Sequence, residues 1–75
     1  MDAVIEKKVG QRIKLLREQR GMTQDLLAAK LQIMGCDITR SAVAKIEVGQ
    51  RHLYPDELIL IKRILGVSFD DILSV

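Results

Sequence analysis

The chain has 75 residues and a net charge of +2, and its 48% of apolar residues suffice for one small domain with an aliphatic core. A single cysteine excludes an internal disulfide, and no apolar run is long enough for a signal peptide or a membrane span, so we expect a cytoplasmic protein that does not enter a membrane. Residues 1–21 hold six basic and three acidic side chains, whereas residues 53–75 hold two and four, which favours a polyanionic partner near the N-terminal part.

The first element is expected to be a helix over residues 3–19, because its apolar residues recur at three- and four-residue spacing. Its buried face is expected to consist of Ile5, Val9, Ile13 and Leu16. A glycine inside a helix costs about 1 kcal/mol relative to alanine. We therefore expect the segment before Gly10 to fray.

The second and third helices each follow a threonine whose hydroxyl can accept a hydrogen bond from an amide of the next turn. Thr23 precedes a helix expected over residues 24–32 or as far as Met34, and Thr39 precedes one expected over residues 40–48. Their inward-facing residues are expected to be Leu27, Leu31 and Met34 in the second helix and Val43 and Ile46 in the third.

The fourth helix is expected to begin at Pro55, which suits a first helical turn because its missing amide would have no partner there. It should end at Leu65 and bury Leu58, Ile61 and Ile64 or Leu65. Ser68 and Asp71 have the spacing of a capping box, which predicts a short fifth helix.

These elements, in this order, resemble the phage repressor/Cro-type (XRE-like) helix-turn-helix family over residues 9–73. The matching blocks are Arg12-Ile13-Lys14-x-Leu16-Arg17, Gly21-Met22-Thr23-Gln24-x-x-Leu27-Ala28, Ile38-Thr39-Arg40-Ser41-x-Val43-x-x-Ile46-Glu47-x-Gly49, and Leu58-x-x-Ile61 with Leu65-Gly66-Val67-Ser68 and Ile72-Leu73. The resemblance implies an all-α, compact five-helix bundle of the lambda-repressor-like type. Residues 1–75 would form one domain, with its helix-turn-helix core at about 23–48. One departure is visible, because the connection over residues 32–38 is longer than the family's turn by roughly four residues.

The third helix carries the candidate residues for reading DNA bases. Arg40, Ser41 and Lys45 share one side, opposite Val43 and Ile46, and arginine can donate two parallel hydrogen bonds to guanine. Ala44 is small enough to approach a thymine methyl group. Taken without the resemblance to the family, these positions are more typical of a solvated helix face than of a DNA contact.

The candidate phosphate contacts lie at the ends of the two central helices. They are Gln24, Thr39, Gln50 and Arg51, with His52 left open between a phosphate contact and an exposed loop residue. A helix N-terminus offers unpaired amides and partial positive charge, which suit a phosphate. The family further implies that Arg17 pairs with Glu47 to fix the third helix and does not touch DNA. Arg12 and Lys14 are expected to be solvated, with phosphate contact as the alternative.

We expect no enzymatic activity, cofactor or metal site, since the chain has one histidine, one cysteine and no phosphate-binding glycine motif. The expected partner is double-stranded DNA, bound by a homodimer at a palindromic operator as a transcriptional repressor or regulator. The residues Phe69, Ile72 and Leu73 are candidates for the dimer contact, or else they close the domain's own core. Two rival functions are a protein-interaction module, such as an antitoxin or coactivator-like adaptor, and the DNA-binding fragment of a larger regulator.

Overall fold

The computed structural model describes residues 2–75, and throughout this range the regular structure is helical. The helices in chain order are α1 (Ala3–Gln19), α2 (Gln24–Ile33), α3 (Arg40–Glu47), α4 (Pro55–Leu65) and α5 (Phe69–Leu73). The expectation of an all-α, five-helix fold is confirmed. Among residues 2–75, no helix has both the length and the apolar character that crossing a bilayer requires.

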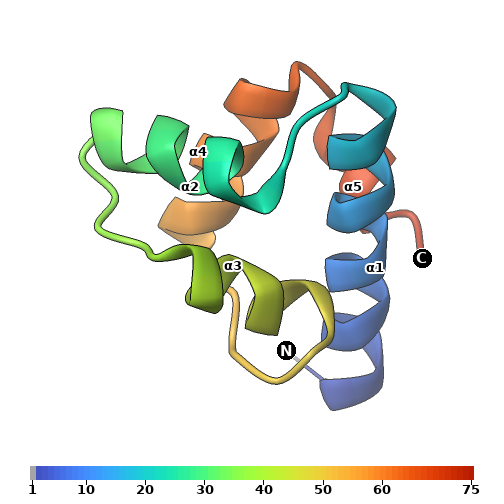
Figure 1. Cartoon of the computed structure of the whole chain (residues 1–75). Coiled ribbons are helices and arrows are strands. Elements are labelled where there is room, and N and C mark those ends of the chain that lie inside the picture. The colour runs from blue at the N-terminus through green and yellow to red at the C-terminus, as the bar shows by residue number, and fades with distance from the viewer. Residues whose placement is uncertain (1) are drawn as a thin grey trace.

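The helices enclose one aliphatic core, and their arrangement is shown in Figure 1. In this view α3 runs below α2 and packs against both α2 and α1, α4 lies behind α2, and the short α5 lies against α1. Residues with almost no exposure include Ile13, Leu27, Leu31, Ile61 and Ile72. Because α3 rests on two other helices, its orientation is fixed by tertiary contacts and not by its own eight residues.

The helix starts follow the side chains that cap them. The hydroxyl of Thr23 accepts a hydrogen bond from the Leu26 amide at 3.0 Å, and that of Thr39 accepts one from the Ala42 amide at 3.1 Å. Ser68 and Asp71 exchange backbone-to-side-chain hydrogen bonds at the start of α5. The capping predictions are confirmed, and they place the N-termini of α2 and α3.

The long connection between α2 and α3 is a helix-closing turn followed by an extended segment. Gly35 adopts φ +87°, and the Cys36 amide reaches back to the Leu31 carbonyl at 2.9 Å, which closes α2 at Ile33. Met34 is consequently exposed, and its expected burial is wrong. The Gln32 side chain then holds the Ile38 carbonyl at 2.7 Å, and Ile38 itself is buried in the core.

The N-terminal half of α1 packs tightly against the end of α3 and the loop that follows it. A Cβ atom added at Gly10 would lie 2.1 Å from the Ile46 carbonyl oxygen, and one added at Gly49 would lie 2.9 Å from Lys7 Cβ. Gly10 is buried inside a continuous helix, so the expected fraying is wrong. The expected burial of Ile5 is also wrong, because this side chain is 47% exposed and the neighbouring Glu6 faces the loop in its place.

Candidate nucleic-acid interface

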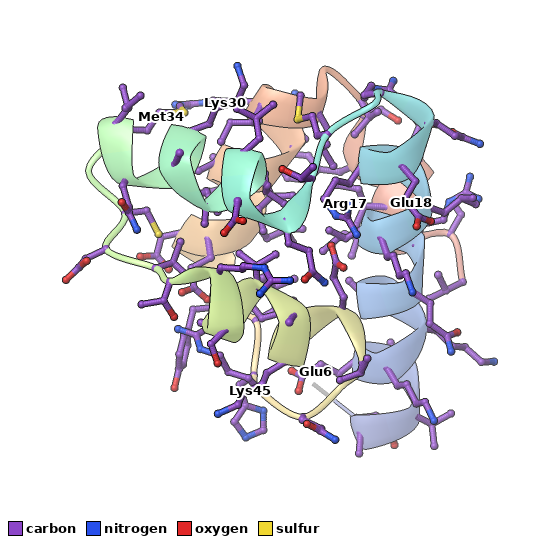
Figure 2. All side chains as sticks on the ribbon, viewed as in Figure 1. Glu6, Arg17, Glu18, Lys30, Met34 and Lys45 are labelled. Atoms are coloured by element: carbon purple, nitrogen blue, oxygen red, sulfur yellow. The ribbon has the colours of Figure 1, made fainter. Side chains whose placement is uncertain are left out.

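The outward face of α3 presents polar and basic side chains on an otherwise apolar helix. Arg40, Ser41 and Lys45 are exposed, Ala44 is half-buried, and the opposite side is buried in the core. Figure 2 shows Lys45 extending from α3 into solvent, on the side away from Lys30 of α2. The structure therefore brings the residues expected to read bases onto one accessible surface.

Three polar side chains from three helices meet behind this surface. Arg17 Nε donates to Glu47 Oε2 at 2.7 Å, and an Arg17 terminal nitrogen donates to Glu47 Oε1 at 3.0 Å. Gln24 Nε2 donates to the same Glu47 Oε1 at 2.9 Å. Both members of the ion pair are buried. We call Arg17, Gln24 and Glu47 the buried polar network.

The buried polar network fixes α3 to the two helices on which it rests. The hydrogen bond with Glu47 raises the pKa of Arg17 further above its ordinary value, against the opposing effect of burial. Arg17 also donates to the Met22 carbonyl at 2.7 Å, just before α2 begins. In Figure 2, Arg17 points from α1 toward the space between α2 and α3, whereas Glu18 points outward. The structure thus brings Arg17 and Glu47 together, and it turns the Gln24 amide toward Glu47.

The first turn of α2 lies beside α3 and contacts it through side chains at both of its ends, Glu47 at the C-terminal end and Arg40 at the N-terminal end. Asp25 Oδ1 in the first turn of α2 is 3.6 Å from Arg40 Nε, at the first residue of α3. Thr39 is exposed just before Arg40, and its hydroxyl is engaged by the cap. Gln50 is exposed in the loop beyond α3. The positions expected to contact phosphate therefore border the α3 surface at both ends.

Arg51 is the exception, because its guanidinium group is held by the protein. It makes two hydrogen bonds to the Glu57 carboxylate, at 2.9 and 3.0 Å, and lies 5.7 Å from the centroid of the Tyr54 ring. It also donates to the His52 carbonyl. The ion pair with Glu57 fixes the loop to α4, and the phosphate contact expected of Arg51 stays a prediction.

This ion pair predicts how stability depends on pH. Burial raises the pKa of Glu57. The opposing effects are larger: hydrogen bonds from Arg51 and from the Tyr54 amide, together with the Arg51 charge, lower the pKa below its ordinary value of 4.5. A carboxylate whose pKa is lowered by folding stabilises the protein above its unfolded pKa, and this contribution is lost as the pH falls through the folded pKa.

We therefore expect wild type to exceed Glu57→Gln in free energy of unfolding above pH 4.5, with the difference shrinking as the pH is lowered further. Urea denaturation of both proteins at a series of pH values between 6 and about 3 measures it. A difference independent of pH would show that the ionised form of Glu57 has no special role.

Sequence reasoning did not identify Glu6 as a buried residue. Its carboxylate is nearly buried and lies 2.9 Å from Nδ1 of the exposed His52. Glu6 has the same spacing to Val9 and Ile13 as a core position would have, so the periodicity was compatible with burial and only its charge argued against it. This contact ties the loop after α3 to the first turns of α1.

Much of the basic excess near the N-terminus serves the fold. Arg12 Nε donates to the Asp71 carbonyl at 2.6 Å, and Arg20 Nε donates to the Leu65 carbonyl at the end of α4. A cation at the C-terminus of a helix is favourable because the unpaired carbonyls there carry partial negative charge. Arg12 is therefore half-buried and tied to α5, while Lys14 is exposed.

The three residues considered for a dimer contact do not share one environment. Ile72 has no exposed surface and belongs to the core, which rules it out as a contact with a second copy of this fold. Phe69 and Leu73 are 42% and 41% exposed, and the Lys62 ammonium group lies 5.3 Å from the centroid of the Phe69 ring.

A family model described as helix-turn-helix matches residues 13–72, which include the buried polar network and the whole α3 surface. The chain belongs to the Cro/XRE-like helix-turn-helix family. That family consists of DNA-binding transcription regulators. The match spans four-fifths of the chain and confirms the resemblance that the sequence blocks indicated.

A solved structure has the same fold. The crystal structure of the DNA-binding domain of BldD superposes with a TM-score of 0.81, covers 97% of this chain and 99% of that chain, and is 22% identical in sequence. At this identity the likeness concerns the fold alone. Among curated proteins, no sequence matches this helix-turn-helix chain significantly.

Proposed function

We propose that this helix-turn-helix protein is a sequence-specific regulator of transcription, acting as a repressor, that places α3 in the major groove of double-stranded DNA. The observation that carries the proposal is the exposed Arg40, Ser41 and Lys45 surface, held in place from behind by the buried polar network. A recognition helix has to present a few base-reading side chains at a fixed angle, and this arrangement supplies both.

The ends of α2 and α3 supply the contacts that would position the protein on DNA. Gln24 and Thr39 lie at helix N-termini, where unpaired amides favour phosphate, and Gln50 lies in the loop after α3. Arg51 and His52 follow in the same loop, where each contacts a carboxylate, Glu57 and Glu6 respectively, and each keeps exposed side-chain surface through which it would reach a phosphate. A DNA regulator also has to share the compartment of its DNA, which in a prokaryotic cell is the cytoplasm.

We further propose that two copies bind a palindromic site. One small domain makes few base contacts, and pairing would place two α3 surfaces on half-sites about 34 Å apart. Phe69 and Leu73 support a dimer contact at the acidic C-terminal end, since they are apolar, partly exposed and carried by α5, which packs on α1 away from α3. The spacing of selected half-sites tests this pairing.

The DNA-binding proposal predicts that Lys45 and Lys30 differ, although both are exposed lysines. If Lys45 contacts DNA, Lys45→Ala should weaken binding and reduce the slope of log affinity against log salt by about one. Lys30→Ala should leave that slope nearly unchanged, because Lys30 lies at the opposite edge of the molecule (Figure 2). Fluorescence anisotropy at 50–300 mM salt measures both slopes, and equal effects would contradict a defined α3 interface.

A second candidate is a protein-interaction adaptor on the same fold. The modest net charge of +2 and the long α2–α3 connection favour it. It predicts weak, sequence-independent DNA binding that disappears at physiological salt, together with a protein partner.

A further inference from the structure

The ion pair between Asp25 and Arg40 joins the two helix starts that border the α3 surface. Asp25 Oδ1 lies 3.6 Å from Arg40 Nε, and the two side chains are 77% and 65% exposed. Exposed ion pairs contribute little to folding stability. This pair is therefore expected to matter for binding and not for folding stability.

Gln24, the residue before Asp25, cannot orient Arg40 because its own side chain is engaged elsewhere. Gln24 donates its side-chain amide to Glu47 at 2.9 Å, on the core side of α2. Asp25 approaches Arg40 at Nε, at the side of the guanidinium group. This geometry leaves the two terminal nitrogens as the donors for a base, and paired donors of this kind recognise the N7 and O6 acceptors of guanine.

The position of Asp25 also gives it an effect on phosphate. It lies in the first turn of α2, where the partial positive charge of the helix would otherwise attract any DNA backbone. A carboxylate there opposes binding that depends on phosphate alone. When Arg40 has no base to contact, it can return to Asp25 at little cost.

We propose that Asp25 is a positioning residue that increases discrimination between DNA sequences. It orients Arg40 toward the base edge and weakens binding to DNA in which Arg40 finds no matching base. The inference rests on the proposed DNA-reading function. It goes beyond that function by assigning selectivity to a residue that need not touch a base itself.

Asp37 provides a matched control. It is an exposed aspartate in the connection before α3, and it has no ion pair within the described residues. Asp25→Asn and Asp37→Asn therefore change the net charge equally, but only the first removes the partner of Arg40. Both variants should unfold at nearly the wild-type temperature, which circular dichroism checks.

The test compares three duplexes by anisotropy at physiological salt: the sequence selected by wild type, the same sequence altered at the base whose preference depends on Arg40, and a random duplex. We expect Asp25→Asn to bind the random duplex several-fold more tightly and to lose roughly 5- to 10-fold of the discrimination at the altered base, within the range of a single base contact. Asp37→Asn should keep the wild-type discrimination. In an Arg40→Gln background, Asp25→Asn should no longer affect it.

Wild-type discrimination in both aspartate variants would overturn the positioning role while leaving the proposed function intact. An equal loss of discrimination in both would assign the effect to net charge and would also overturn it. A wild-type protein without any base preference would overturn the proposed function, and this inference with it.

Discussion

Replacing Glu47 with alanine is expected to lower the free energy of unfolding by about 3–5 kcal/mol, the usual cost of leaving one partner of a buried ion pair alone. Arg17 would stay buried against α3 without a carboxylate, and Gln24 would lose its acceptor. The total stability of a folded domain is only about 5–15 kcal/mol. The Glu47→Ala variant of this small domain would therefore be partly unfolded at moderate temperature.

Urea denaturation followed by circular dichroism measures this loss. Glu18→Ala is the control, because the Glu18 side chain is exposed and points outward from α1 (Figure 2), and it should change stability by no more than about 0.5 kcal/mol. Replacing both members of the pair with apolar residues, as in Arg17→Met with Glu47→Leu, should recover much of the loss. A cost below about 1 kcal/mol for Glu47→Ala would show that the buried polar network does not hold α3 in place.

Replacing Gly10 with alanine is expected to destabilise the protein by about 1–3 kcal/mol, the usual range for overpacking. A Cβ atom at this position would lie 2.1 Å from the Ile46 carbonyl oxygen, and backbone cannot move aside as a flexible side chain can. Helix propensity predicts the opposite sign, since alanine is favoured over glycine in a helix interior by about 1 kcal/mol. The sign of the change therefore decides between the two effects.

Thermal and urea denaturation of Gly10→Ala, with Gln11→Ala as the exposed neighbouring control, measure this change. Gln11→Ala should lie within about 0.5 kcal/mol of wild type. Weakened DNA binding by folded Gly10→Ala would further show that the close approach of α1 sets the position of α3. A stabilised Gly10→Ala protein would contradict the tight contact between α1 and α3.

The helix starts were predictable because their causes are local. Thr23, Thr39 and Ser68 each cap a helix through an amide two or three residues into the first turn, so neighbouring residues hold all the information required. The α3 surface was predictable for a similar reason, because helical periodicity separates Val43 and Ile46 from the polar side.

Several of the errors concern contacts between different elements of the fold. Gly10 looked like a weak point within α1 until the Ile46 carbonyl was placed beside it. The pairing of Arg51 with Glu57 likewise depends on where α4 lies. Ile72 could face the core or a partner, and only its packing decides. The Arg17–Glu47 pair, 30 residues apart, was expected from the family resemblance alone, because nothing in the local pattern pairs these residues.

Selection of bound sequences from a randomised duplex library, at physiological salt, tests most directly whether α3 reads DNA. Wild type and Arg40→Ala are compared, with Arg63→Ala on α4 as the control for loss of an exposed arginine. The proposed function predicts that wild type selects a palindrome with half-sites about 34 Å apart, that Arg40→Ala loses the preference at one position of each half-site, and that Arg63→Ala keeps it. If wild type recovers no motif and binds every duplex equally weakly, α3 does not read DNA and the search turns to a protein partner.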